Sequence, residues 1–386
     1  MVSWLCKILP LLHGWTHGAP PFLPLFRKNL SMNNALPIGA TIGILGGGQL
    51  GRMLAVAAAR LGLKVHIFEP SANPPAGDVA HRVTTASYED HAALTAFGQS
   101  VDVITYEFEN IPTSALDLLE TLAPIHPGRQ ALATSQDRLI EKTFLQGLGL
   151  QTAPFADVPD MAALDVAIAS IGAPAILKTR RMGYDGKGQS RIKTAQDAPR
   201  ALADMAEAPA ILEGFVNFTH EVSVIGARGQ DGSVACYDPG ENVHQDGILR
   251  TTKVPANLTA SQRTDAVLIA ARILNALDYV GVMGVELFVT PQGLIVNEIA
   301  PRVHNSGHWT QNGCTICQFE QHIRAVAGWP LGDGSRHADV IMENLIGNDM
   351  DRLGDYAKTD AAIHLYGKAE VKPGRKMGHV NRIFRA

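Results

Sequence analysis

The chain has 386 residues and a formal net charge of -4, so it is long enough for two or three domains. It has no run of lysines and arginines of the kind that binds nucleic acid, so we expect no nucleic-acid partner. No apolar segment is long enough for a transmembrane helix, so we expect no membrane association. Four cysteines do not form a disulfide framework and fit a reducing compartment.

Residues 1–38 differ in composition from the rest of the chain. They combine a short apolar run, Ile8–Leu12, with a proline-rich stretch, Ala19–Pro24. The apolar run is too short to cross a bilayer, and its surroundings match a signal peptide poorly. Met32 lies shortly before the first expected strand. We therefore interpret residues 1–38 as an extension that is disordered or that results from a start codon placed too early.

The first regular pattern is a β-α-β unit. We expect a strand over Thr41–Leu45, a glycine-rich turn over Gly46–Gly51, a helix over Arg52–Leu61 and a strand over Lys64–Phe68. A further strand over Val101–Tyr106 ends in the sequence EFEN. Alternating strands and helices predict a parallel sheet with its site at the carboxyl ends of the strands.

The turn matches a dinucleotide-binding fingerprint through Gly46, Gly48 and Gly51, and Glu69 has the spacing of a ribose-binding carboxylate. Glycines at these positions bring backbone N–H groups and a helix N-terminus close to a phosphate. The motif does not specify whose phosphate is bound. A nicotinamide dinucleotide, another phosphorylated ligand and simple close packing all remain open.

The second region begins with an amphipathic helix over Asp137–Leu148, which carries Arg138 and Lys142. A strand over Ala175–Thr179 follows, with Lys178 near its end. A basic residue at the end of a strand, before a glycine-rich loop, favours a phosphate site.

The segment Gly183–Gln189 combines three glycines with a lysine and an aspartate between two expected strands. It can close over phosphates as a mobile lid, or it is an ordinary hairpin tip. Further along, strands over Ala210–Glu213 and Glu221–Ala227 are joined through Gly214–Val216. This link is either an adenine slot or a plain connection.

A hairpin later in the chain brings two glutamates together. Two apolar runs flank Pro291–Gly293, which predicts a three-residue loop. This register pairs Thr290 with Leu294 and Glu286 with Glu298. Like charges directly across a ladder are destabilising, so one carboxylate should take a proton or both should share a cation. Oxygen ligands suit Mg²⁺, which arrives with phosphates, although two glutamates on a solvated strand face remain the alternative.

The polar segment after the hairpin contains Arg302, whose guanidinium can bind an oxyanion or phosphate with two hydrogen bonds. His304 and His308 have a spacing that suits zinc on a helix, but nearby glycine and proline argue against a helix there. The basic loop Lys372–His379 is either a second phosphate contact or a solvated tail.

The order of these motifs resembles the ATP-grasp ligases. The stretches GGGQLGRM, YEFENIP, QDRLIEK, GYDGKGQ, HQDGILR and NEIAPRVHNSGHWTQNG are similar to those of the N5-carboxyaminoimidazole ribonucleotide synthetase family, over about residues 42–379. The resemblance implies an α/β and α+β multidomain fold. Its parts are a Rossmann-like, parallel-sheet preATP-grasp domain over 39–135, an ATP-grasp domain over 136–330 with a mobile lid at about 150–215, and a small β-rich C-terminal domain over 331–386.

The resemblance also implies a reaction of purine biosynthesis. ATP, bicarbonate and 5-aminoimidazole ribonucleotide give N5-carboxyaminoimidazole ribonucleotide, ADP and phosphate. Bicarbonate attacks the γ-phosphate to form carboxyphosphate, and the carboxyl group, as such or as carbon dioxide, passes to the amine. The expected cofactors are ATP and Mg²⁺, with Mn²⁺ as an alternative. A cytoplasmic homodimer is typical of the family.

Site residues follow from the matching motifs. Those expected to bind ATP are Arg138, Lys178, Gly183, Tyr184, Asp185, Gly186, Lys187, Gly188, Gln189, Glu213, Gly214, Phe215, Val216, Glu221, His244, Asn297 and Glu298. Those expected to hold the metal are Glu286, Asn297 and Glu298. Those expected to bind the ribonucleotide are Gly48, Gln49, Leu50, Glu107, Arg375 and Lys376. Those expected at the reacting groups are Arg302, Tyr184, Asp185 and His304.

Two rival functions remain from other classes. A nicotinamide-dependent oxidoreductase would use Gly46–Gly51 and Glu69, but it leaves the Gly183–Gln189 loop and the glutamate hairpin unexplained. A non-catalytic nucleotide-binding protein would keep the fold without turnover. The sequence also departs from the family pattern, because it ends at Ala386 where many members continue, and Lys372 stands where the family often has arginine.

Overall fold

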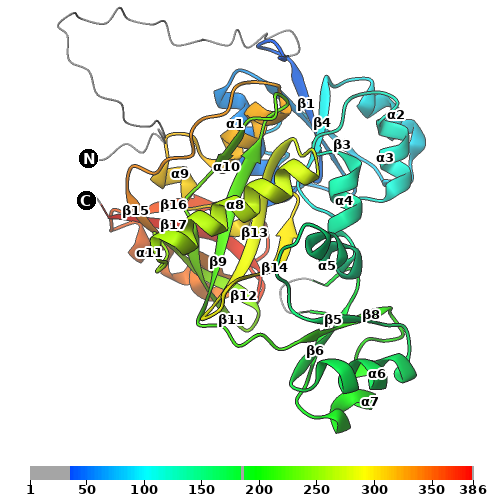
Figure 1. The fold of residues 1–386 in the computed structure, drawn as a ribbon. Coiled ribbons are helices and arrows are strands. Elements are labelled where there is room, and N and C mark those ends of the chain that lie inside the picture. The colour runs from blue at the N-terminus through cyan, green and yellow to red at the C-terminus, as the bar shows by residue number, and fades with distance from the viewer. Residues whose placement is uncertain (1–34, 184–186, 385–386) are drawn as a thin grey trace, which may run out of the picture. The chain divides into compact units, whose positions relative to one another are not determined.

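Three sheets organise residues 35–183 and 187–384, the part of the chain that this computed structural model describes (Figure 1). The chain divides into two compact units after Asn34, and the second unit begins at Ala35. Its first residues are attached by two hydrogen bonds, from the Leu36 amide to the Ala327 carbonyl (2.9 Å) and from Trp329 Nε1 to the Leu36 carbonyl (2.8 Å). Within these described ranges, no helix is both long and apolar enough to cross a membrane.

The first sheet is parallel, as the β-α-β pattern predicts. Its strands are β1 (Thr41–Leu45), β2 (Lys64–Glu69), β3 (Arg82–Thr85) and β4 (Val103–Tyr106), in the order β3-β2-β1-β4. The associated helices are α1 (Gln49–Arg60), α2 (His91–Gly98), α3 (Thr113–Leu119) and α4 (Arg129–Ser135). Helix α1 begins three residues before the predicted Arg52, because the turn ends at Gly48 and the third glycine of the motif, Gly51, is already helical.

The second sheet is small and antiparallel. Its strands are β5 (Phe155–Val158), β6 (Ala175–Thr179), β7 (Gln189–Ile192) and β8 (Ala210–Gly214), in the order β5-β8-β6-β7. Helices α6 (Met161–Ile171) and α7 (Ala198–Ala203) cover one face of it, and a 3-10 turn, η1 (Ala195–Asp197), precedes α7 (Figure 1). Leu164, Leu177 and Leu212 are fully buried between helices and strands and form the centre of this hydrophobic core.

The third sheet has nine strands and is antiparallel. Its members are β9 (His220–Arg228), β10 (Val234–Cys236), β11 (Gly240–Gln245), β12 (Ile248–Val254), β13 (Gly281–Thr290), β14 (Gly293–Ala300), β15 (Asp339–Ile346), β16 (Ala362–Leu365) and β17 (Lys376–Phe384). The order is β14-β13-β9-β11-β12-β15-β17-β16, with β10 paired to β9. Strand β14 therefore lies at one edge of the sheet.

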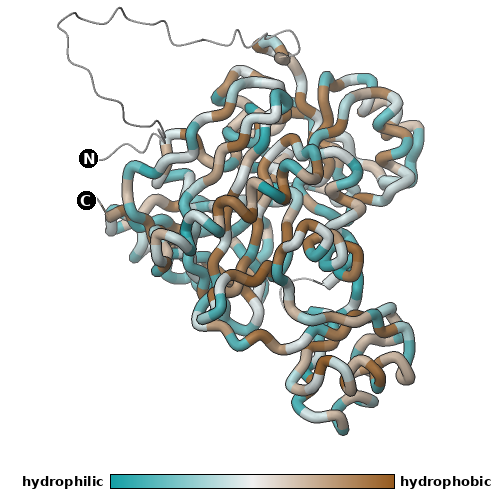
Figure 2. Tube along the Cα trace, in the orientation of Figure 1, coloured by the Kyte–Doolittle hydropathy of each residue, from teal (hydrophilic) through white to brown (hydrophobic). Residues whose placement is uncertain are grey.

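Helices lie on both faces of this large sheet. They are α5 (Arg138–Gly147), α8 (Ala260–Ala276) and α10 (Gln318–Val326), with shorter turns η2 (Asn305–Gly307), α9 (Thr310–Gly313), η3 (Gly347–Arg352) and α11 (Leu353–Tyr356). On β13, Met283 and Val285 belong to the core that includes α8, whereas Val282 belongs to the core that includes α10. Figure 2 shows the hydrophobic residues of these strands and of α8 as brown segments. This alternation turns Glu286 away from α8.

The glutamate hairpin differs from the prediction in its loop but not in its central pair. Thr290 lies opposite Gly293, so the loop has two residues and the predicted pairing of Thr290 with Leu294 is wrong. A β-bulge between Leu287 and Glu286 then adds one residue to β14, and Glu286 lies opposite Glu298 as predicted. The bulge residue is Asn297, which has no register partner on β13.

A cluster of two buried histidines and one half-buried histidine lies where β16 and β17 pack against the residues before α9. His364 and His379 stack with ring centroids 4.5 Å apart, and His308 lies 4.7 Å from His379. The Tyr366 hydroxyl is 2.9 Å from His379 Nδ1, and His379 is fully buried. Burial lowers the pKa of His308, His364 and His379, so all three rings are neutral in the folded protein.

These histidines predict that acid destabilises the fold. Their pKa values are lower when folded than when unfolded, so the unfolded chain binds more protons as the pH falls below about 6.5. The free energy of unfolding in urea should fall from pH 7.5 to pH 5.5, and His379→Phe should reduce this loss by up to about 1.4 kcal/mol per pH unit. An identical pH dependence in wild type and His379→Phe would contradict the assignment.

Candidate active site

A cavity of about 610 Å³ brings together residues of the two antiparallel sheets and residues that follow β1 and β4 of the parallel sheet. It is large enough for a nucleotide-sized ligand. The predicted site residues that line it are Gln49, Leu50, Glu107, Arg138, Lys178, Gly183, Lys187, Gln189, Glu221, His244, Glu286, Asn297, Glu298, Arg302, His304 and Lys376. Residues separated by more than 300 positions in sequence thus face one space.

Other predicted residues do not line this cavity. They are Gly48, Gly188, Glu213, Gly214, Phe215, Val216 and Arg375. Phe215 is 41% exposed, and the Arg191 guanidinium lies 4.8 Å from its ring centroid. Tyr184, Asp185 and Gly186, three of the predicted lid residues, lie outside the described residues.

The two paired glutamates have opposite electrostatic surroundings. Burial, and then the charge of Glu298, raise the pKa of Glu286 above its usual range. Burial works in the same direction at Glu298, but Arg138, with Nη1 3.0 Å from Glu298 Oε2, holds the pKa of Glu298 below its usual range. One carboxylate of the pair therefore has a compensating cation, whereas the other faces its neighbour with little compensation.

This donor set fits Mg²⁺ better than zinc. Glu286 and Glu298 supply carboxylate oxygens, and the bulge lets the consecutive residues Asn297 and Glu298 both face the cavity. Among residues 35–183 and 187–384, no three His, Cys, Asp or Glu side chains form a metal-binding group. Mg²⁺ does not need one, because one or two carboxylates hold it together with substrate phosphates.

His304 lies beside this pair but is neutral. Its Nε2 is 3.4 Å from Glu286 Oε1, and its Nδ1 is 2.8 Å from the Ser306 hydroxyl. Burial and the charge of Arg302 lower the pKa of His304 to about 3. His308 contacts Gln318 instead, so the two histidines do not share one ligand position.

Arg302 is held by a carboxylate that the sequence analysis did not assign to the site. Its Nε and Nη2 lie 2.5 and 3.1 Å from the two carboxylate oxygens of Glu109, which is a bidentate ion pair. Burial would raise the pKa of Glu109, but the Arg302 charge lowers it. Glu109 is also tied at its backbone, since the Gln136 side-chain amide donates to its carbonyl at 2.6 Å.

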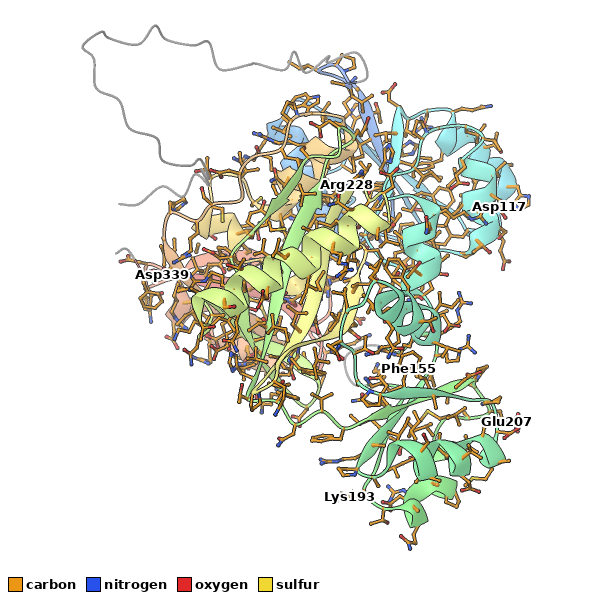
Figure 3. All side chains as sticks on the ribbon, viewed as in Figure 1. Asp117, Phe155, Lys193, Glu207, Arg228 and Asp339 are labelled. Atoms are coloured by element: carbon orange, nitrogen blue, oxygen red, sulfur yellow. The ribbon has the colours of Figure 1, made fainter. Side chains whose placement is uncertain are left out.

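Lys178 is likewise paired inside the protein. Its Nζ lies 2.9 Å from Glu213 Oε2, and Lys142 Nζ lies 3.4 Å from the same oxygen. Burial opposes ionisation of Glu213, but the two lysines lower its pKa, so it is a carboxylate. The backbone of Glu213 pairs with Phe155 of β5, which Figure 3 labels. The side chain that was expected near adenine therefore contacts the lysine expected at the phosphates.

The glycine-rich turn binds carboxylates of the protein itself. The Gly48 and Gly51 amides donate to the two oxygens of Glu107, and the Gly47 amide donates to Glu69 Oε2 at 2.8 Å. These are the backbone donors that a phosphate would use. Glu69 thus faces the turn, which leaves the dinucleotide interpretation without its ribose-binding carboxylate.

Two further contacts complete the cavity wall. His244 Nδ1 lies 2.6 Å from Glu221 Oε2; burial alone would lower the pKa of His244, but this carboxylate raises it. Phe218 and Phe288 both line the cavity and stack with ring centroids 4.6 Å apart. The cavity wall therefore combines an aromatic pair with a polar pair, and Phe288 lies opposite Glu221 in the sheet.

The basic loop contributes one lining residue. Lys376 lines the cavity, and Lys368 Nζ donates to its carbonyl at 2.7 Å. Arg375 donates to the Glu370 carbonyl at 3.1 Å. Lys372 forms an exposed ion pair with Glu370.

Sequence analysis missed three charged residues of the site: Glu109, Glu141 and Lys142. Glu141 and Lys142 are 2% and 1% exposed, although an amphipathic helix predicts charged residues in solvent. The spacing of Arg138, Glu141 and Lys142, at i, i+3 and i+4 on one helix face, was the available signal.

Comparison with known proteins identifies the family. Residues 39–136 match the ribonucleotide synthetase preATP-grasp domain, 143–319 the ATP-grasp domain and 340–385 the phosphoribosylaminoimidazole carboxylase C-terminal domain. N5-carboxyaminoimidazole ribonucleotide synthase of Brucella melitensis is 54% identical over 90% of this chain and 98% of its own length. The chain belongs to the N5-carboxyaminoimidazole ribonucleotide synthetase family. The enzyme of Pseudomonas aeruginosa is 42% identical, over 88% and 93% of the two chains.

Solved structures of the family agree with the fold. An N5-carboxyaminoimidazole ribonucleotide synthetase bound to ADP superposes with a TM-score of 0.88 at 40% identity, covering 91% of this chain and 94% of that one. The Aspergillus clavatus synthase in complex with ADP and 5-aminoimidazole ribonucleotide superposes at 0.85 with 32% identity, covering 90% and 94%. The predicted fold class and the prediction of an ATP-dependent purine-biosynthesis ligase are confirmed.

The electrostatics of the glutamate pair generate a prediction for the free protein. Because the pKa of Glu286 is raised on folding, stability is lost as the pH rises through the folded pKa. Glu286→Gln should therefore raise the free energy of unfolding at pH 8 by on the order of 1 kcal/mol, without nucleotide present, and abolish turnover. Thermal unfolding without ligands measures the first effect.

The same comparison at pH 5.5 is the control. The increase in the free energy of unfolding caused by Glu286→Gln should be smaller at pH 5.5, because the Glu286 carboxyl group of the wild type is largely protonated in the folded protein there. A variant that is less stable than wild type at pH 8, or equally stabilised at both pH values, would show that the two carboxylates do not repel each other.

Proposed function

We propose that this chain carboxylates 5-aminoimidazole ribonucleotide with bicarbonate by way of carboxyphosphate, using ATP with Mg²⁺. The observation that carries the proposal is the Glu286–Glu298 pair, which faces the same cavity as Lys178 and Arg302. Phosphoryl transfer needs charge neutralisation and positioning more than a protein nucleophile. The metal neutralises phosphate charge when it is bound.

The nucleotide and the metal are assigned to one end of the cavity. Lys178 contacts the ATP phosphates, with Gly183–Gln189 closing over them. Adenine is assigned to Glu213–Val216, although these residues do not line the cavity of the ligand-free protein. The Glu221 carboxylate binds the ribose hydroxyls beside His244. Glu286, Asn297 and Glu298 hold Mg²⁺, or Mn²⁺ in its place, because they offer oxygen ligands and one under-compensated negative charge.

Bicarbonate is assigned to Arg302 with His304 beside it. The fork of Arg302 already holds Glu109, which fixes its plane and leaves Nη1 with only a long contact of 3.4 Å to the Val303 carbonyl. A planar anion can bind that remaining edge. Neutral His304 can donate or accept a hydrogen bond beside the anion without adding a charge.

The ribonucleotide phosphate is assigned to the basic loop at Arg375 and Lys376. The glycine-rich turn is less suited to a phosphate, since Glu107 and Glu69 occupy its donors and would repel an anion. Gln49, Leu50 and Glu107 then face the rest of the ribonucleotide. A cytoplasmic homodimer completes the proposal by family analogy.

A coupled assay of ADP and phosphate release tests this function. With ATP and Mg²⁺, rapid ADP formation should require 5-aminoimidazole ribonucleotide, because the nucleotide completes the site. Carboxylated product should appear when bicarbonate is added. A rate that the ribonucleotide does not stimulate would contradict the substrate, and reduction of NAD by an alcohol would restore the oxidoreductase hypothesis.

Lys178→Ala serves as the variant control. It should raise the ATP concentration needed for half-maximal rate while leaving the response to the ribonucleotide unchanged, since Lys178 is assigned to the ATP phosphates. If the ATP dependence of the rate is unchanged in this variant, the proposed contact between Lys178 and ATP is wrong, whereas the assignment of the ribonucleotide as substrate is unaffected.

A further inference from the structure

We propose that Glu141 and Lys142 are positioning residues that orient the Glu298 carboxylate through the backbone on either side of it. The inference rests on the proposed role of Glu298 in holding Mg²⁺. It assigns a role to two buried charged residues that touch neither the nucleotide nor the metal in the proposed function.

The contacts involve three consecutive residues of β14. Glu141 Oε1 accepts a hydrogen bond from the Ile299 amide at 2.7 Å, and Lys142 Nζ donates to the Asn297 carbonyl at 2.7 Å. Between them, Glu298 receives Nη1 of Arg138 at 3.0 Å. Helix α5 therefore contacts residues 297, 298 and 299 through one face, since side chains three and four positions apart are neighbours on a helix.

The position of β14 explains why side chains of α5, and not another strand, form hydrogen bonds with its backbone. As the edge strand, β14 has β13 on one side only, so its outer backbone groups need partners that are not strands. The Val296 amide finds one in the Gln151 carbonyl. The next groups along the strand are the Asn297 carbonyl, which accepts from the Lys142 side chain, and the Ile299 amide, which donates to a carboxyl oxygen of Glu141.

Glu141 and Lys142, which we call the two anchors, each have the hydrogen-bonding character that their backbone partner requires. A carbonyl requires a donor, which lysine supplies, and an amide requires an acceptor, which glutamate supplies. Burying a charged residue is costly unless it is hydrogen-bonded, and both residues are almost completely buried. Glu141 and Lys142 therefore each satisfy one backbone group of the edge strand.

The β-bulge makes these anchors important for the proposed metal site. An unpaired residue in a strand disrupts the ladder locally, so the backbone of Asn297 is not fixed by β13. The two anchors fix it from the opposite side and keep the Glu298 carboxylate facing Glu286. Hydrogen bonds behind a metal ligand typically change metal affinity by about 10–100-fold when they are removed.

The test compares two substitutions at Glu141 in the full chain. Glu141→Gln keeps the length and an oxygen acceptor for the Ile299 amide, whereas Glu141→Met keeps the length and removes the acceptor. Binding of Mn²⁺ in the presence of ADP is measured by electron paramagnetic resonance, and ADP binding in EDTA is measured by calorimetry. We expect Glu141→Met to weaken Mn²⁺ binding by about tenfold or more with unchanged ADP binding in EDTA, and Glu141→Gln to bind Mn²⁺ like wild type.

Two results would overturn the inference. Mn²⁺ binding by Glu141→Met that equals wild type would remove the positioning role, and equal losses in both variants would show that the acceptor is not what matters. If Glu141→Met does not fold, Lys142→Gln and Lys142→Leu provide the same comparison, because a glutamine amide still donates to the Asn297 carbonyl. Weaker Mn²⁺ binding in both Lys142 variants, or in neither of them, would then overturn the inference.

Glu298→Gln separates this inference from the proposed function. If Glu298→Gln binds Mn²⁺ as wild type does, the proposed metal role of Glu298 is wrong. If Glu298→Gln loses Mn²⁺ and Glu141→Met does not, the metal role stands and only the positioning role is wrong.

Discussion

The contact between one face of helix α5 and the edge strand β14 determines the geometry of the site. Arg138 contacts the Glu298 carboxylate, and Glu141 and Lys142 contact the backbone on either side of it. Lys142 also reaches Glu213, and Glu213 pairs with Lys178. One short helix thus links the glutamate pair of the large sheet to a lysine of the small sheet through buried polar contacts.

Internal charge pairing is a second property of the cavity. Arg302 has Glu109, Lys178 has Glu213, and the donors of the glycine-rich turn have Glu107. Each of these three groups could bind an anionic ligand and already has a carboxylate partner. Burial of an unpaired charge would be costly, so removing one member of these pairs would destabilise the ligand-free protein. A ligand phosphate that binds here would replace one of these carboxylates as the partner of the cation or backbone donor. Each of these positions already accommodates an anionic group.

The sequence predicted those parts that depend on local pattern. Apolar periodicity located β1, β6 and α5 to within a residue or two, and turn residues located the hairpin. The Glu286–Glu298 pair was predicted correctly although the loop length was not, because the bulge at Asn297 compensates for the shorter loop. No local signal marks this bulge, and the Asn297 carbonyl contacts Lys142 of α5, more than 140 residues away in sequence.

The partners of the charged site residues could not be predicted for the same reason. Arg302 pairs with Glu109 across 193 positions, and a single sequence does not reveal such contacts. The burial of Glu141 and Lys142 was not predicted from the sequence either, because charged residues on an amphipathic helix usually face solvent. Their burial follows from the edge strand that α5 covers.

The most direct test of the account is a crystal structure of the protein with Mg²⁺ and a non-hydrolysable ATP analogue. The account predicts a Mg²⁺ ion with oxygens of both Glu286 and Glu298 at about 2.0–2.1 Å, and Lys178 on the analogue's phosphates. The backbone at Asn297 and Ile299 should stay bonded to Lys142 and Glu141. A Mg²⁺ ion held by other carboxylates, with Glu286 and Glu298 left unliganded, would contradict it.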